Sequence, residues 1–266
     1  MRLKISHETR YEFSQPVSYA LNQLRLAPKS RNGQKVLSWD VEIEGGVKQA
    51  EFVDQFNNQT MLVSTDPGAT TLLVKAYGEV ETEDKSGVVG KHGGATPLWF
   101  YERKSELTKP GPTIRKIANS LGSDFDNDVD RMHALAKAIQ ANVQYETGTT
   151  EVTTTAEEAA AAGHGVCQDH AQIFVSAARY LGYPARYVSG YLMMNDRVHQ
   201  DASHAWAEVY VDALGWVGFD ISNAISPDSR YVAVATGLDY DDAAPISGLS
   251  FGPGAETLEV TVQVQQ

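Results

Sequence analysis

The single cysteine of this chain, Cys167, is the residue best suited to act as a nucleophile. From Cys167 onward, apolar residues recur every three or four positions, which predicts one face of a helix. They are Ala171, Phe174, Val175, Ala178 and Leu181. In the first turn of a helix, a sulfur lies near unpaired backbone N–H groups and the positive end of the helix dipole. Both favour thiolate over thiol, so the segment predicts a nucleophilic cysteine.

Thiol catalysis also needs an imidazole that takes and returns a proton, and a third group that orients the imidazole. His204 and Asp220 stand at the two ends of a predicted hairpin of strands 203–211 and 216–220. Their separation is even, and two such residues share a face of an antiparallel hairpin only if its loop has an odd number of residues. A loop of residues 212–214, followed by a bulge at Gly215, would meet that condition.

The elements around these residues predict two parts. Residues 1–84 alternate between apolar and polar and are interrupted by turn signals such as Asn32-Gly33, which predicts a β-rich, sandwich-like module. Residues 85–108, rich in charge and glycine, are predicted to be a linker. Residues 109–266 form the predicted core, an α+β unit in which helices come first and an antiparallel sheet follows. Helices are expected at about 112–121, 128–143 and 156–162, and late strands at about 231–235 and 258–264.

Composition limits the partners of the chain. The 266 residues carry a net charge of −12, which argues against nucleic acid or an anionic membrane as a partner. No apolar run approaches the ~20 residues of a membrane span. The N-terminus shows no signal peptide and one cysteine cannot form an internal disulfide, so a cytoplasmic location is predicted. Neither a metal nor a cofactor is expected.

Four segments resemble the core of the bacterial transglutaminase-like superfamily. They are Gly165–Ala171 (GVCQDHA), Leu181–Tyr191 (LGYPARYVSGY), His204–Val209 (HAWAEV) and Gly215–Asp220 (GWVGFD). Residues 7–11, 24–28 and 54–58 also resemble the N-terminal region that often precedes such cores, and residues 237–245 resemble a C-terminal extension. The resemblance implies a papain-like fold and a catalytic triad of Cys167, His204 and Asp220.

Two positions depart from the family pattern. Asp220 is followed by Ile221-Ser222-Asn223 where the family usually has Pro-Thr-Asn, and Leu238 stands where an arginine is common. Both departures bear on the rim of the site and on substrate preference, because neither removes a member of the triad.

The resemblance implies a cysteine protease or amidase that acts on a protein or peptide amide through a thioester intermediate. Transfer of the acyl group to an amine, as in a transglutaminase, is one alternative. A non-catalytic peptide-binding scaffold with the same fold is another. The backbone N–H of Cys167 is a candidate oxyanion donor, and Tyr145 or Gln168 is the candidate for the second donor.

Other readings of the same residues compete with catalysis. A lone cysteine is often a small buried hydrophobe. His164, Cys167, Asp169 and His170 could instead be zinc ligands, although residues before and within a first helical turn need not converge and paired cysteines are absent. Asp169 is expected to cap or brace the helix, and it is also, with His164 and Trp206, a candidate for the wall of the site. Residues 239–242, three of which are acidic, are expected to form a solvated or capping loop in preference to a calcium site.

Overall fold

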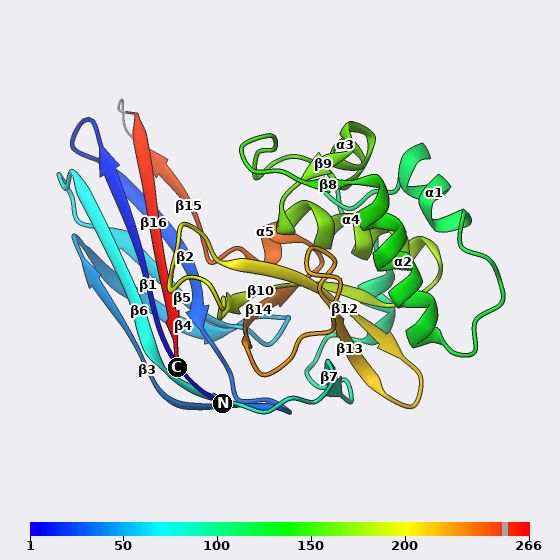
Figure 1. Cartoon of the computed structure of the whole chain (residues 1–266). Helices are drawn as coiled ribbons and strands as arrows, with labels where there is room; N and C mark the ends of the chain where they lie inside the picture. Colours follow the sequence, from blue (N-terminus) through cyan, green and yellow to red (C-terminus); the bar gives the residue numbers. More distant parts are fainter. Residues whose placement is uncertain (252–254) are drawn as a thin grey trace.

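Alternating side chains build the N-terminal module into two antiparallel sheets packed face to face. The computed structural model describes residues 1–251 and 255–266. The first six strands are β1 Arg2–Phe13, β2 Tyr19–Ala27, β3 Gln34–Glu44, β4 Gly46–Val53, β5 Gln59–Thr65 and β6 Thr71–Thr82. In β1 every second side chain is buried, which gives one apolar face. Tyr11, Leu24, Val63 and Leu72 meet in the core between the sheets, so the predicted sandwich is confirmed (Figure 1).

The last two strands complete these sheets. β16 (Glu256–Gln265) pairs antiparallel with β1, and β15 (Ile246–Phe251) pairs with β2. Figure 1 shows the red C-terminal strand beside the blue N-terminal one. The sequence pattern groups residues 109–266 as one core, but strand pairing assigns these two strands to the module. The boundaries of the parts stay predictions, since the chain leaves the module and later returns to it.

The segment predicted as a linker, residues 85–108, forms the edge of the core sheet. Strand β7 (Val88–Gly90) pairs with β13, and a 3₁₀ helix over Leu98–Glu102 buries Tyr101. The ring of Tyr101 lies 5.1 Å from that of Trp216 in an edge-to-face contact. Charge and glycine content therefore did not reveal that this segment packs on the core.

The core places one sheet against a buried helix. The sheet has the order β14-β10-β12-β13-β7, with β10 Ala185–Leu192, β12 His204–Val211, β13 Gly215–Phe219 and β14 Tyr231–Gly237. The longer helices are α1 Pro112–Asn119, α2 Asp128–Asn142, α3 Ala156–Ala162 and α4 Cys167–Tyr180. Short elements are β8 Gln144–Tyr145, β9 His164–Gly165, β11 His199–Gln200 and α5 Tyr240–Ala243. These positions confirm the predicted helices and the α+β class.

Helix α4 is the centre of the core. Every residue from Asp169 to Arg179 is buried, because β12 covers one side of the helix and α1, α2 and α3 cover the other (Figure 1). Most of the buried residues are apolar, and the charged Arg179 donates to the backbone carbonyls of Tyr101, Ala185 and Leu238. Such a helix gives its first residue a fixed position. In the described part of the chain, no helix is long and apolar enough to cross a membrane.

Two side-chain amides of the module form hydrogen bonds with backbone groups at the open edge of the core sheet. Gln34 donates to the carbonyl of Ala233 at 2.9 Å and accepts from the N–H of Ala233 at 2.8 Å. Asn58 makes the same two bonds with Thr236, both at 2.8 Å. These amides take the place of a neighbouring strand for β14, whose backbone groups would otherwise be buried without partners. These four hydrogen bonds fix the position of the module against β14 of the core.

Candidate active site

Cys167 is the first residue of α4, as its position in the sequence predicts. The carboxylate of Asp169 accepts a hydrogen bond from the N–H of Val166 at 2.8 Å and from the hydroxyl of Thr150 at 2.7 Å. A Cβ atom at Gly165 would lie 2.7 Å from Asp169, so glycine is required for this approach. Asp169 therefore braces the start of the helix, which confirms its predicted structural part.

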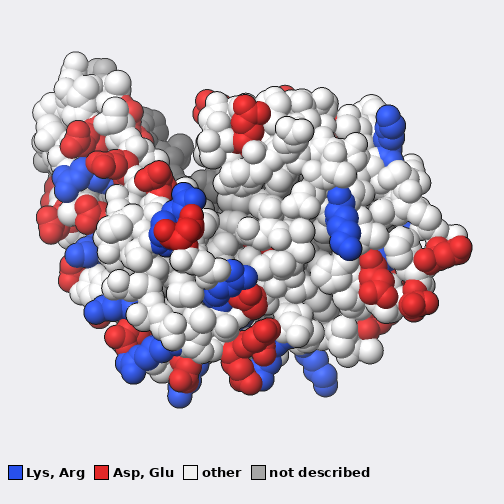
Figure 2. Space-filling model, in the orientation of Figure 1, with Lys and Arg blue, Asp and Glu red and all other residues white. Residues whose placement is uncertain are grey.

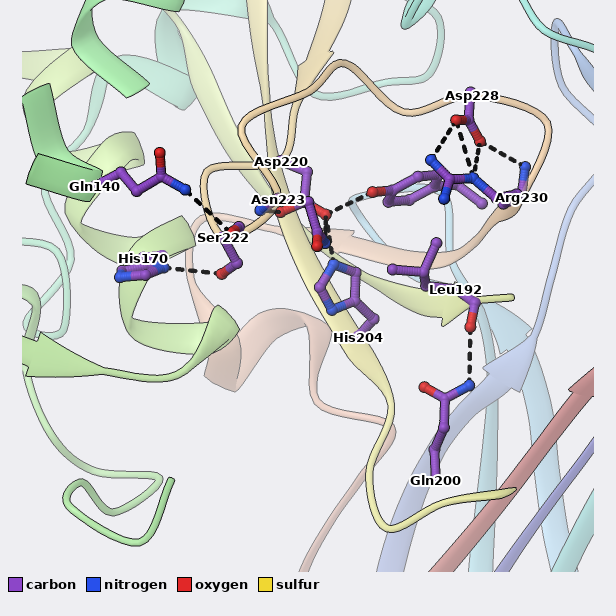
Figure 3. A network of polar contacts seen from close by, with 11 residues as sticks. Gln140, His170, Leu192, Gln200, His204, Asp220, Ser222, Asn223, Asp228 and Arg230 are labelled. Atoms are coloured by element: carbon purple, nitrogen blue, oxygen red, sulfur yellow. Dashed lines mark hydrogen bonds and ion pairs between the residues drawn. The ribbon is translucent and has the colours of Figure 1, made fainter. Parts of the chain in front are cut away.

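The hairpin has the odd loop that the sequence requires. Val211 pairs with Gly215, which leaves the three residues 212–214 in the loop, and Ala213 and Gly215 have φ values of 70° and 80°. His204 and Asp220 consequently lie on one face. Figure 3 shows the His204 ring directed at Asp220, with its Nε2 donating to Oδ2 at 2.6 Å.

Two further residues hold Asp220 in place. The hydroxyl of Tyr231 donates to Oδ2 at 2.7 Å, and Asn223 donates to the same oxygen through its side chain at 2.8 Å. The backbone N–H of Asn223 donates to Oδ1 at 3.1 Å (Figure 3). Sequence reasoning missed both roles. The asparagine that ends the family's Pro-Thr-Asn pattern is a signal for Asn223, whereas nothing in the sequence distinguishes Tyr231.

The pair is buried, and its electrostatics follow from that burial. Burial alone would lower the pKa of His204, which is 7% exposed, but its hydrogen bond to Asp220 and its interactions with Cys167 raise the pKa to about 10. Burial alone would raise the pKa of Asp220. The hydrogen bond and charge of His204 outweigh this effect of burial, so the pKa of Asp220 lies below its ordinary value. Because Nε2 is bound to Asp220, Nδ1 is the nitrogen left for the thiol.

The remaining predicted site residues divide into supports and walls. Trp206 is fully buried, and its ring lies beside that of His204, with the ring centres 6.3 Å apart and the planes inclined by 29°. The side-chain amide of Gln168 donates to the carbonyl of Val152 at 3.1 Å. Tyr145 lies opposite Gly165 in the parallel pair of β8 and β9. Tyr145 is 56% exposed, and its partial burial together with the charges of Cys167 and Asp220 raises its pKa.

The zinc reading does not fit the geometry. His170 is buried, with Nε2 bonded to the carbonyl of Val143 at 3.0 Å and Nδ1 to the hydroxyl of Ser222 at 2.8 Å (Figure 3). Among the residues that the structure describes, no three His, Cys, Asp or Glu side chains are placed to share a metal ion. His164 and His170 are thus not brought together with Cys167 as ligands.

The acidic segment forms a capping loop. Asp239 is the N-cap of α5, and the carboxylate of Asp242 accepts from the N–H of Leu238 at 3.0 Å. The carbonyl of Leu238, where the family commonly has arginine, accepts from Arg179 at 2.7 Å. The predicted cap is confirmed. The backbone at position 238 is held by Arg179 even though leucine replaces the arginine that is common there.

Two family models match the chain over most of its length. Residues 115–221 match the transglutaminase-like superfamily, and residues 3–81 match the bacterial transglutaminase-like N-terminal region. The chain is a transglutaminase-like protein. Its transglutaminase-like core holds Cys167, His204 and Asp220, which the family resemblance predicts as a triad.

Relatives of this transglutaminase-like protein span its whole length. An uncharacterized protein of Mycobacterium leprae is 28% identical, over 99% of this chain and 98% of the relative. An uncharacterized protein of Mycobacterium tuberculosis is 26% identical, over 99% and 92%. A crystal structure from Cytophaga hutchinsonii, described as a "Putative Cysteine Protease", has a TM-score of 0.79 and 23% identity, and covers 100% of this chain and 91% of its own. That last likeness concerns the fold.

We predict that the His204 imidazole is still protonated at neutral pH, since its interactions with Asp220 and Cys167 raise its pKa to about 10. Asp220→Asn should lower this pKa, because burial would then be opposed only by Cys167. The charged ring stabilises the fold most fully below its unfolded pKa of about 6.5, and this contribution is lost as the pH rises through the folded value. Nitrogen-15 NMR of the histidine rings measures the titration directly.

Tyr231→Phe is the matched control, because it removes one hydrogen bond from Asp220 and keeps the carboxylate charge. It should shift the titration less than Asp220→Asn does. A His204 ring that is neutral at neutral pH in the native protein, or equal titrations in all three proteins, would contradict the assignment.

Proposed function

We propose that this transglutaminase-like protein is a cysteine-dependent amide hydrolase acting on protein or peptide substrates. The observation that carries the proposal is the buried His204–Asp220 hydrogen bond of 2.6 Å, and the interaction of the ring with Cys167 also helps to raise the pKa of His204. An imidazole held between a carboxylate and a thiol can keep the thiol ionised and later return a proton.

The first half of the reaction makes a thioester. The Cys167 thiolate attacks the carbonyl carbon of the amide, and the carbonyl oxygen takes the negative charge. His204 then gives its proton to the leaving nitrogen, the C–N bond breaks, and the amine departs. Asp220 keeps the ring in place and stabilises its charged form. The acyl group is left on sulfur.

The second half decides the class of enzyme. Water loses a proton to His204 and attacks the thioester, and the carboxylic acid leaves as the thiolate re-forms. If a primary amine attacks instead, the same steps give transamidation. We favour water as the acceptor because the sequence contains no recognisable motif for an amine site.

Two hydrogen-bond donors are proposed for the oxyanion. The N–H of Cys167 is one of the first helical N–H groups, which have no partner within the helix. Tyr145 is the second, because the amide of Gln168 is already bonded to a backbone carbonyl. On the face shown in Figure 2, charged side chains crowd the module and are sparser over the core.

An acyl-transfer experiment tests the proposal without a known substrate. With p-nitrophenyl acetate, the native protein should release a burst of p-nitrophenol and carry an acetyl group on Cys167, detected by mass spectrometry. Cys167→Ala and His204→Ala should lack the burst, while His133→Ala, a histidine on α2 outside the site, should keep it. Added methylamine should change the product only if the protein is a transamidase. A native protein that forms no acyl adduct would favour a peptide-binding scaffold.

Tyr145→Phe should lower kcat by ~10²–10³ with KM little changed, because the loss of one oxyanion donor acts on the transition state. The phenyl ring keeps the shape of the site wall, so binding of the ground state is preserved. Steady-state kinetics on the same ester give both constants. A kcat within about twofold of native would assign Tyr145 to the wall alone.

A further inference from the structure

A cavity lies between the module and the core, and Cys167 does not line it. Its volume is about 320 Å³, and both parts of the protein line it. The module contributes the loop after β2 and the loop between β4 and β5, and the core contributes parts of β10, β13 and β14. A ligand bound here would therefore contact both parts at once.

The lining of this cavity is strongly cationic. Lys29, Arg31, Lys91 and Arg186 all line it, and none of its lining residues is acidic. The chain as a whole has 34 acidic and 22 basic residues, so this grouping runs against its composition. Four cations around one space of this size create a local positive potential that favours an anion.

One buried carboxylate fixes the two arginines without neutralising them both. Glu208 is fully buried, and it accepts from Arg31 at 2.8 Å and from Arg186 at 2.7 Å. Burial raises the pKa of Glu208, but the two guanidinium groups outweigh it and lower the pKa to about 2. The Arg186 guanidinium also lies 4.1 Å from the centre of the Trp216 ring. Two positive charges thus share one negative charge.

The two lysines add charge that no acid neutralises. The ammonium of Lys29 donates to the side-chain carbonyl of Asn57 at 2.8 Å, a neutral partner. Asp54 acts on Lys29 from a distance, but its carboxylate is bonded to Arg25 at 3.3 Å and to Asn58 at 3.0 Å. Within the described ranges, 1–251 and 255–266, neither Lys29 nor Lys91 forms an ion pair.

The proposed catalytic residues do not line this cavity, since Cys167, His204 and Asp220 are all absent from its walls. Arg186 pairs directly with Glu208, so the two side chains lie on the same face of the sheet. Tyr187 and Ala205 alternate onto the other face and contact Ala171 of α4 and Cys167. The cationic cavity is therefore a site of its own, and its ligand does not depend on the chemistry proposed for the thiol.

We propose that this cavity binds a phosphate group, held between the module and the core. A phosphate offers several acceptor oxygens and up to two negative charges, which suits cations that converge from several directions. Arginine presents a planar fork of donors to such oxygens, and lysine adds a point charge. The volume accommodates free phosphate and also a larger molecule that carries one.

Calorimetric titration with sodium phosphate, against sodium chloride at matched ionic strength, tests the proposal on the full chain. The native protein should bind phosphate, and phosphate should raise its thermal unfolding midpoint more than it raises that of the Lys29, Lys91 double variant, since general salt stabilisation acts on both. The double variant Lys29→Ala, Lys91→Ala should bind about a hundredfold more weakly, because it loses two charge-assisted bonds. The matched control Lys104→Ala, Lys116→Ala removes the same charge from exposed positions elsewhere and should bind as the native protein does.

A parallel titration with ADP distinguishes the sources of the phosphate. Tighter binding of ADP than of phosphate, lost in the Lys29, Lys91 variant, would identify a larger phosphate-bearing ligand, and equal or weaker binding would identify the free ion. The proposal is overturned if phosphate behaves as chloride does, or if both double variants bind it equally. The lysines lie outside the packed core, so their removal should leave the native unfolding midpoint in chloride nearly unchanged.

Discussion

The hydrogen bond between His204 and Asp220 is the interaction on which the rest of the site depends. Two ionisable groups are removed from water here, and a buried pair of this kind is favourable only if its geometry is good and its other polar atoms have partners. Tyr231 and Asn223 supply those partners to Asp220, and the Trp206 ring lies beside the imidazole. The pair then holds a positive charge beside Cys167, at the start of a helix whose dipole also favours the thiolate.

The fold meets this requirement by fixing both sides of the site independently. On one side, α4 is buried along its length and braced at its first turn by Asp169, so Cys167 cannot move without disturbing the core. On the other side, the module holds the core sheet in position. Its side-chain amides pair with the edge strand β14, and its strand β16 pairs with β11 in the segment just before His204. We infer that the module is a structural part of the site as well as a neighbour of it.

Local patterns in the sequence were sufficient for the helices, the sandwich and the hairpin. The even separation of His204 and Asp220 required an odd loop, and the three-residue loop is present because Ala213 and Gly215 adopt positive φ. Pairing between distant segments could not be predicted this way, since a strand's periodicity says which face is buried and not which strand lies beside it. The pairing of β15 and β16 with the module was therefore not predicted. The hydrogen bond from Tyr231 to Asp220 was not predicted either, because no local sequence pattern links two residues 11 positions apart across a loop.

The most direct test of the account is the pH dependence of iodoacetamide alkylation at Cys167, in the native protein and in His204→Ala, with the site confirmed by mass spectrometry. The account predicts that the native thiol stays reactive well below the pH at which an ordinary cysteine, with a pKa of ~8.5, loses its reactivity. Removal of the imidazole should restore the ordinary profile. If both proteins lose reactivity together at the pH of an ordinary thiol, there is no thiolate–imidazolium pair, and the chain keeps the fold without a prepared nucleophile.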